Sequence, residues 1–451
     1  MIGFLKTEKK VKSKFDRTVF TSFSNVESDQ KGVLVASDSM NCDCKGGMLS
    51  RGLGREQFCT DSGCKVYIPN KGCCALAYVY KDMGDVFDKK LVCMGWDGSL
   101  DIFNENYEDF ETEDVFEQEC KMLYFVNENK EVGLFIYGED MAALYYLTSG
   151  VHKLSYTVQS ACVYNHRLFM ALHPFKIAYS AVCDGESITE SLEDGGTLFY
   201  FSEGGEKIRA MQVLDGCIYL FSSHAIGRLK PAGDPRDFVL EKVPYAGGEI
   251  FGDSVATVGN RICFLATDGV YSFNGTVAKK THKKLPIYPK REGQVCGYCI
   301  FEDQYILHYI DAYKGTRMAV LNGDGENGYF SFSADGVYNL EGRAVHSQDE
   351  NFFVFDPNGE LPDKEEAFFQ TEKVRFSVGK TAITELSFEG EGFAELTVTS
   401  ERESKTYPLT FTDGKAILKT RLLGEGFVFR FQLQAGAKIK RMEVLTETLG
   451  G

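Results

Sequence analysis

A turn followed by an apolar strand recurs along the middle of this chain. The unit reads VYNHRLFMAL, VLDGCIYLFS, TVGNRICFLA and IFEDQYILHY. Its equivalent strand positions are Leu168, Ile218, Ile262 and Tyr305, which lie 50, 44 and 43 residues apart. A four-stranded blade of a β-propeller takes about 40 to 50 residues, and such blades bury their faces by packing side by side in a ring. The repeat therefore predicts an all-β chain that contains a β-propeller.

The same repeat, continued at a similar spacing, extends in both directions along the chain. Backwards it reaches Leu134 and Leu91, and forwards it reaches Phe352. Residues 72–366 thus have room for six or seven blades. Counting the units favours seven, whereas the uneven steps of 34 and 50 residues leave six open.

Asp-Gly pairs mark hairpins inside these units. In NRICFLATDGVYSFNG, Asp268-Gly269 separates the apolar runs 262–266 and 270–273. Asp-Gly between such runs is a strong signal for a tight β-hairpin. Helical periodicity is nearly absent, and the most helix-like stretch, 139–147, is short.

The two ends of the chain differ from the middle. In residues 367–451 apolar and polar positions alternate cleanly, as in VFRFQL at 428–433. Alternation of this kind indicates strands with one buried and one wet face, so we expect a jelly-roll-like β-sandwich there. Residues 1–71 are the least regular, and we expect an N-terminal arm that is able to supply a strand closing the ring.

Charge and hydropathy restrict the surroundings of the protein. The 451 residues carry a formal net charge of -16, which argues against a general nucleic-acid binder but not against a wall past which DNA slides. No apolar run reaches the 18 residues that a spanning helix needs, so we expect no membrane-spanning segment and synthesis in a cytoplasm. In a reducing compartment most of the 14 cysteines should be buried thiols.

The sequence offers few candidates for chemistry, and we expect no enzyme, no catalytic residue and no cofactor. Six cysteines crowd into 33 residues, which makes a metal site conceivable; ordinary thiols are the favoured interpretation because the spacing matches no standard zinc motif. The weak metal candidates are Cys42, Cys44, Cys59 and Cys64. The acidic run 105–119 is most simply a solvated loop.

One basic stretch, KKTHKKLPIYPKR, stands out in this acidic chain. It forms a possible interaction patch for DNA or for an acidic neighbouring subunit, and a solvated turn is the alternative. The patch consists of Lys279, Lys280, Lys283, Lys284, Lys290 and Arg291.

Three stretches resemble a known family. A motif near the N-terminus, SDSMNCDCKGGMLSRGLG, is similar to one near the start of propeller-bearing tail hub or nozzle proteins of tailed bacteriophages and prophages. The residues that carry the similarity are Asn41, Gly46, Gly47, Leu49, Arg51 and Gly52. KIAYSAVCDGESI and GDSVATVGNRICFLATDGVYSFNG resemble strands and a blade in the middle of these proteins. The cysteine-rich N-terminal segment departs from the family pattern.

The resemblance implies a structural protein of the virion tail, made in the cytoplasm of a bacterial host. Such a protein assembles as a ring of its own copies, often six, around the channel through which DNA leaves. Its outer face holds adaptors or fibres, and the passing DNA is not bound in a sequence-specific way.

Two other functions compete with this expectation. A carbohydrate-active or glycan-binding propeller with an accessory sandwich module would need two carboxylates at hydrolytic spacing and aromatic platforms. The single tryptophan, Trp96, weighs against it. A WD40-like scaffold is weaker still, because the chain has one Trp-Asp dipeptide and no Gly-His.

Overall fold

The structure is a computed structural model that describes residues 14–448, except 26–27, 29, 60–64, 69–71, 83–86, 105–106, 108, 140, 173–175, 187–198, 201–205, 232–236, 291–294 and 364. The described residues form β-strands and short 3₁₀ helices, with no α-helix among them, so the expectation of an all-β chain is confirmed. The stretch 139–147, the most helix-like in the sequence, contains the strand β13 (Ala142–Tyr146). No helix in the described part of the chain has the length and apolar character needed to cross a membrane.

The chain divides into two compact units. The ring unit comprises Arg55–Glu326 and Ser333–Asp356. The two-ended unit comprises Met1–Gly54, Asn327–Phe332 and Pro357–Gly451.

The ring unit begins with an eight-stranded sheet of order β10-β9-β8-β7-β12-β13-β14, in which β11 pairs with β12. Its other strands are β7 (Ala75–Asp82), β8 (Phe87–Met94), β9 (Ser99–Phe103), β10 (Phe110–Val115), β11 (Lys121–Val126), β12 (Val132–Tyr137) and β14 (Gly150–Leu154). A single residue pair, Val132 and Tyr80, joins the two halves. The halves are therefore two antiparallel groups, β7–β10 and β11–β14, whose strands pair at one point and whose buried side chains share one core.

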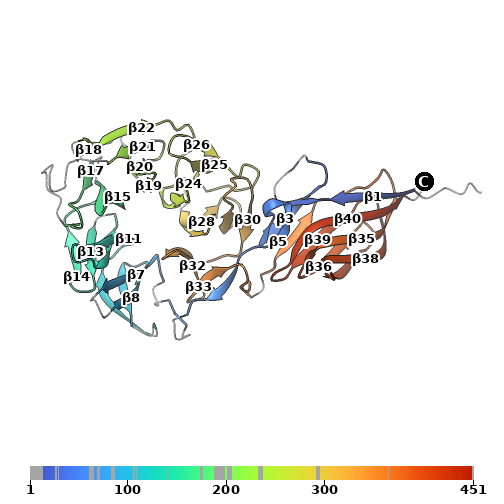
Figure 1. The fold of residues 1–451 in the computed structure, drawn as a ribbon, viewed down its shortest axis with the longest axis horizontal. Helices are drawn as coiled ribbons and strands as arrows, with labels where there is room; N and C mark the ends of the chain where they lie inside the picture. The colour runs from blue at the N-terminus through green and yellow to red at the C-terminus, as the bar shows by residue number, and fades with distance from the viewer. Residues whose placement is uncertain are drawn as a thin grey trace, which may run out of the picture. The chain divides into compact units, whose positions relative to one another are not determined.

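Four-stranded sheets follow in chain order (Figure 1). One contains β15 (Val158–Tyr164), β16 (Arg167–Leu172), β17 (Lys176–Tyr179) and β18 (Phe199–Tyr200). The next contains β19 (Ala210–Leu214), β20 (Cys217–Phe221), β21 (Ile226–Lys230) and β22 (Val239–Val243). After the 3₁₀ helix η3 (Gly252–Ser254) come β23 (Ala256–Val258), β24 (Arg261–Ala266), β25 (Gly269–Phe273) and β26 (Ala278–Lys280).

The last sheets join residues far apart in the sequence. One contains β27 (Val295–Phe301), β28 (Gln304–Asp311), β29 (Gly315–Leu321) and β30 (Gly328–Ser331). The other contains β31 (Gly336–Leu340), β32 (Arg343–Gln348) and β33 (Asn351–Asp356), with β6 (Gly54–Gln57) beside β33. The N-terminal segment thus supplies a strand to the sheet that ends the ring unit.

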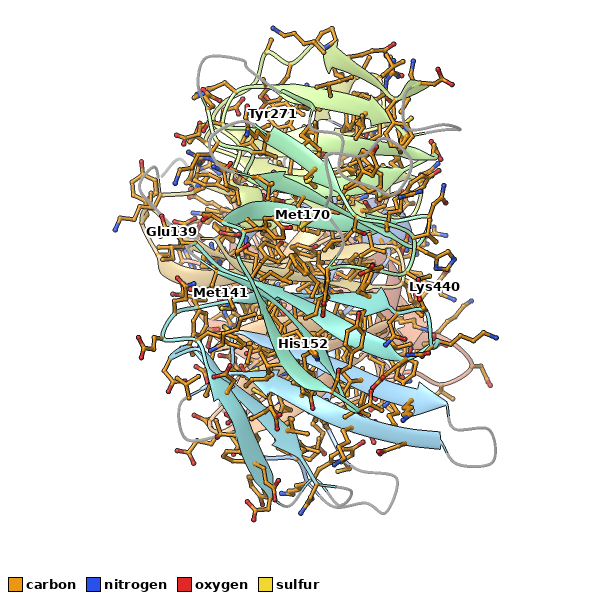
Figure 2. All side chains as sticks on the ribbon, turned by 90° about the vertical axis from the view of Figure 1, so that its left-hand side faces the viewer. Glu139, Met141, His152, Met170, Tyr271 and Lys440 are labelled. Carbon is orange, nitrogen blue, oxygen red and sulfur yellow. The ribbon has the colours of Figure 1, made fainter. Side chains whose placement is uncertain are left out.

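Buried side chains fill the spaces between successive sheets and also between the last and the first. Tyr338 and Phe352 from β31 and β33 share one core with Leu76 and Leu91 from β7 and β8. Figure 2 shows Met170 among the packed sheets, whereas Glu139 lies at their edge. Sheets that bury their faces against one another in a closed circle form a β-propeller.

The positions that define the sequence repeat lie in the core of this ring. Six of them fall on the second strand of their group and are buried: Leu91 on β8, Leu134 on β12, Leu168 on β16, Ile218 on β20, Ile262 on β24 and Tyr305 on β28. Phe352 is buried too, but it lies on β33, the third strand of its sheet, one strand later than the repeat requires. The second strand there is β32, where Val345 is buried.

The two-ended unit consists of two sheets over one core. The first sheet has the order β38-β35-β40-β5-β4, with β1 on β40. Its strands are β1 (Lys14–Phe20), β4 (Cys42–Asp43), β5 (Leu49–Arg51), β35 (Thr381–Glu391), β38 (Lys415–Gly424) and β40 (Lys438–Thr448). The second has the order β2-β3-β34-β39-β36-β37, built from β2 (Ser22–Ser24), β3 (Val33–Met40), β34 (Phe368–Thr371), β36 (Phe393–Thr399), β37 (Ser404–Thr410) and β39 (Val428–Leu433).

The N-terminal strands are part of this unit's core, which differs from the irregular arm that the sequence suggested for residues 1–71. Phe23 packs edge-on against Phe369 and Phe431, with ring centroids 5.8 and 5.9 Å apart. β1 runs antiparallel to β40 from Lys14 opposite Thr448 to Phe20 opposite Met442. Their role was hidden in the sequence because β1 is mostly exposed and its partner strand is at the other end of the chain.

Candidate functional site

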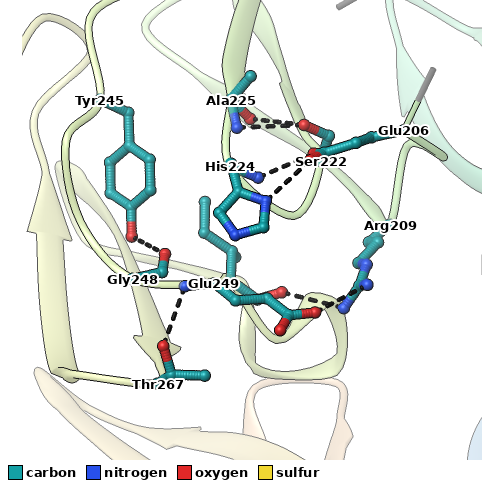
Figure 3. Close-up of polar contacts among 10 residues, drawn as sticks. Glu206, Arg209, Ser222, His224, Ala225, Tyr245, Gly248, Glu249 and Thr267 are labelled. Carbon is teal, nitrogen blue, oxygen red and sulfur yellow. Dashed lines mark hydrogen bonds and ion pairs between the residues drawn. The ribbon is translucent and has the colours of Figure 1, made fainter. Parts of the chain in front are cut away.

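Polar side chains gather at one end of the propeller strands. Two kinds of loop lie there: those that lead into the first strand of a sheet, and those that join the second strand of a sheet to its third. Glu206 lies before β19, and His224 lies in the loop between β20 and β21 (Figure 3). His224 Nδ1 is 2.8 Å from Glu206 Oε1, and the His224 backbone N–H donates to Glu206 Oε2 at 3.0 Å. Burial raises the pKa of Glu206, but these hydrogen bonds lower it more, so its pKa lies below the usual range. Glu206 is therefore held as a carboxylate.

A second ion pair lies beside the first. Arg209 Nη2 is 2.9 Å from Glu249 Oε1. Glu249 sits on the loop before η3, and the Thr267 hydroxyl accepts from its backbone N–H at 3.0 Å. Tyr245 donates to the Gly248 carbonyl of this loop at 2.7 Å, as Figure 3 shows. The loop is thus fixed to two neighbouring sheets.

A third ion pair connects first-strand regions of sheets that are not neighbours. Lys121, at the start of β11, pairs with Asp253 in η3. Crowding by protein lowers the pKa of Lys121, but Asp253 and Tyr137 raise it more, so its pKa lies above the usual value. Both side chains remain about half exposed, at 48% and 53%, so water still reaches the pair.

One carboxyl at this end has the opposite character. Desolvation raises the pKa of Glu119, the nearby Asp253 carboxylate raises it further, and Lys121 lowers it. Glu119 lies at the end of the acidic run singled out in the sequence, in the segment between β10 and β11.

The basic patch lies on the loop that leads from β26 to β27. Lys279 and Lys280 end β26, and Lys280 Nζ lies 3.6 Å from the Asp268 carboxylate. Lys283, Lys284 and Lys290 are exposed on the loop itself. Arg291 lies outside the described residues.

This loop carries a feature that sequence reasoning missed. The exposed rings of Tyr288 and Tyr313 meet with centroids 5.6 Å apart and planes at 84°. Both are held in place by the buried carboxylate of Asp311. The run Asp-Ala-Tyr-Lys-Gly at 311–315, an Asp that begins a turn ending in Gly, is the signal that could have pointed to it.

The structure does not bring the weak metal candidates together. Cys42 and Cys44 are buried in the two-ended unit, where desolvation raises the pKa of both thiols. Cys59 is exposed in the ring unit, and Cys64 lies outside the described residues. Among the residues that are described, no three His, Cys, Asp or Glu side chains are grouped so as to hold a metal ion.

Two small pockets lie elsewhere. One of about 100 Å³ in the ring unit is lined by Cys59, Tyr78, Lys89, Tyr107, Leu340, Glu341 and Arg343. Lys89 and Glu341 form an ion pair of 2.7 Å in it. The other, about 240 Å³, lies on the sheet of β1, β35, β38 and β40 in the two-ended unit, where Arg17 and Arg441 both pair with Glu443.

Comparison with known proteins leaves the function open. No family model and no curated protein matches the chain. Among solved structures, the Cps50 (Swd1) β-propeller domain of Myceliophteria thermophila is 9% identical and covers 66% of this chain and 99% of its own, with a TM-score of 0.43. Virginiamycin B lyase from Staphylococcus aureus is 8% identical and covers 76% of this chain and 99% of its own, also with a TM-score of 0.43. Similarities this weak carry no argument about what the chain does.

Proposed function

We propose that this protein is a non-enzymatic structural component of a phage or prophage tail, a hub or nozzle protein that assembles with its own copies. The observation that carries the proposal is the pairing of charges at the candidate site. Glu206, Glu249 and Asp253 each face a histidine, arginine or lysine side chain that holds a loop or joins two sheets. Carboxylates paired in this way stabilise a scaffold, and as long as they remain paired they are not available as acids, bases or nucleophiles.

We interpret the ring unit as seven blades, six of them formed by consecutive strands and the last closed by β6. The sheet order supports this count, with β7–β10 and β11–β14 taken as separate blades. We interpret the two-ended unit as a β-sandwich, which its two sheets over one shared core support.

In the proposed assembly DNA passes between copies and not along the axis of one propeller. Lys121 and Asp253 join the first-strand regions of two sheets that are not neighbours, and we take this pair to obstruct the middle of the ring. The channel would instead be bounded by the outer surfaces of several copies, six by the family resemblance. The net charge of -16 suits such a wall, because fixed negative charge keeps phosphates from binding.

The location of the protein in particles tests this function. Particles from the strain that carries the gene would be purified, analysed by mass spectrometry and labelled with gold-conjugated antibodies against the ring unit. We expect the protein in the particles and gold at the distal end of the tail, where adaptors and fibres attach. Its absence from purified particles would contradict the proposal.

One observation favours a second candidate function, a carbohydrate-active propeller. Desolvation and the neighbouring Asp253 raise the pKa of Glu119, and glycosidases work with a pair of carboxyl groups in which one acts as the acid. Turnover on a panel of glycans, lost in Glu119→Gln but kept in Glu117→Gln, would support this alternative and remove the structural one. Glu117 is the matched control because it is exposed two residues earlier in the same segment.

A further inference from the structure

Two exposed tyrosines of the ring unit, Tyr288 and Tyr313, meet to form an aromatic surface. Tyr288 is 54% exposed and Tyr313 is 81% exposed. Isolated exposed aromatic residues are ordinary, but two in contact on separate loops present a continuous apolar area to solvent. Tyrosine is also among the residues that most often anchor protein interfaces.

Asp311 ties together the backbones of the two loops that carry these tyrosines. Its buried carboxylate accepts hydrogen bonds from the backbone N–H groups of Tyr313 at 2.9 Å and Lys314 at 3.1 Å. It also accepts from the Tyr288 N–H at 3.3 Å, and the Ala312 N–H donates to the Tyr288 carbonyl at 2.7 Å. A surface ordered before binding loses little conformational entropy when a partner docks.

Three lysines lie close to the tyrosines along the chain. Lys290 follows Tyr288 by two residues, Lys314 follows Tyr313 directly, and Lys283 lies on the same loop as Tyr288. All three are exposed, and none of their ammonium groups forms an ion pair with another described residue. Tyr288, Tyr313, Lys283, Lys290 and Lys314 are called the tyrosine–lysine surface below. In a chain of net charge -16, such a surface favours an acidic partner.

The chain itself carries an acidic surface of suitable form. β10 is the outermost strand of its sheet, and one of its edges has no neighbouring strand in the described sheet order. Glu111, Thr112 and Glu113 on it are exposed, and Val115 is 42% exposed. An edge strand with carboxylates beside an apolar side chain matches lysines beside tyrosines.

We propose that the tyrosine–lysine surface of one copy binds β10 of a second copy. The two surfaces belong to different sheets of the same unit, so every copy presents both and the contact is head-to-tail. Head-to-tail contacts close into rings when the rotation between copies permits. The inference rests on the proposed function, in which copies assemble, and it assigns the surfaces that do so.

Charge reversal tests the contact in solution. One variant carries Lys283→Glu, Lys290→Glu and Lys314→Glu; the other carries Glu111→Lys and Glu113→Lys. Association would be measured by sedimentation at low ionic strength, because exposed charges are screened by salt. We expect each variant alone to associate at least about tenfold more weakly than the wild type, because like charges then face each other. An equimolar mixture of the two should associate again.

Two further variants separate this contact from other effects. Tyr313→Ala should weaken association by about tenfold or more without changing net charge. Lys130→Glu, on the exposed turn between β11 and β12, should leave association unchanged. All altered side chains are on the surface, and thermal unfolding would verify that each variant is folded.

The outcomes distinguish the contact from the function. The contact is overturned if either charge-reversal variant alone associates as strongly as the wild type, or if the mixture of the two variants fails to recover association. A wild type that remains monomeric at high concentration overturns it too. None of these results bears on whether the protein is found at the tail of particles, which tests the function independently.

Discussion

Lys121 on β11 and Asp253 in η3 form an ion pair although the β15–β18 and β19–β22 sheets lie between them in chain order. Tyr137 and Tyr298 lie near the pair, since both charges perturb the pKa of these tyrosines. A direct bond between distant parts of a ring constrains it in a way that contacts between neighbouring sheets do not. The pair is therefore expected to matter for the ring as a whole.

A double-mutant cycle on Lys121→Met and Asp253→Asn would measure this coupling. Because both side chains are half exposed, we expect about 1 kcal/mol, at the upper end for exposed pairs. Lys438 and Glu391 form a matched control pair at 2.9 Å with exposed fractions of 45% and 53%. Unfolding by urea should give a smaller coupling for the control. Equal coupling free energies for the two pairs would show that joining distant sheets gives the Lys121–Asp253 pair no additional effect on stability.

Two buried histidines make the ring unit sensitive to acid. Burial lowers the pKa of His308 to about 4; burial, and then Arg55, lower the pKa of His346 to about 3. Since an unfolded histidine titrates near 6.5, the unfolded chain binds more protons below that pH and stability falls until the folded pKa is reached. Each neutral histidine thus stabilises the fold fully above about pH 6.5 and progressively less down to its own folded pKa, about 4 for His308 and about 3 for His346.

Unfolding free energies between pH 7 and pH 4 would test this. His308→Leu should reduce the slope of stability against pH by about 1.4 kcal/mol per pH unit in that window. His166→Leu is the control, because His166 is exposed on the turn between β15 and β16. An unchanged slope in His308→Leu would mean that the buried imidazole is already protonated in the fold.

Thiol reactivity should follow burial. Desolvation raises the pKa of Cys42, Cys44, Cys162 and Cys299 in the folded protein, so these thiols should resist alkylation. Cys59 is exposed and should react first among the described cysteines. Brief iodoacetamide treatment followed by peptide mass mapping would show the order. Early labelling of Cys162 or Cys299 would indicate that the core opens locally.

The N-terminal segment should be essential to the ring unit. Phe58, directly after β6, is buried in the core shared by the last and first sheets, and its backbone N–H donates to the Phe352 carbonyl at 3.0 Å. Phe58→Ala should destabilise the ring unit by about 3 to 5 kcal/mol. Phe393→Ala, at a position that is 37% exposed, should have a much smaller effect. Similar losses in both variants would mean that closure contributes little.

The repeat could be found in the sequence because the second strand of each group is buried on both faces. Such strands are near-continuous apolar runs, and Ile262 to Ala266 on β24 is an example, fully or almost fully buried. The sequence repeat placed its last position on β33, one strand too late, because His346 interrupts the apolar run of β32. The next strand, with Phe352, then matched the pattern better than Val345 did.

The remaining features depend on contacts that local patterns do not encode. β1 and β3 pair with strands more than 300 residues away, as the Ala36–Thr371 pairing shows. The basic stretch could be located by its charge, but Tyr313 lies on the turn between β28 and β29, and its contact with Tyr288 depends on how two separate loops meet. The ion pair of Lys121 and Asp253 likewise follows from the closure of the ring and from no motif.

The pairing of β1 with β40 has a consequence for synthesis on the ribosome. β1 is made first but cannot find its partner until residues 438–448 have been translated. The ring unit between them is translated earlier. It is therefore able to fold while the backbone N–H and C=O groups of β1 still lack the partners that β40 provides. A ribosome that stalls once residue 356 has left its exit tunnel, but before residues 438–448 are made, would therefore hold a folded ring unit whose β1 remains open to pairing with other nascent chains.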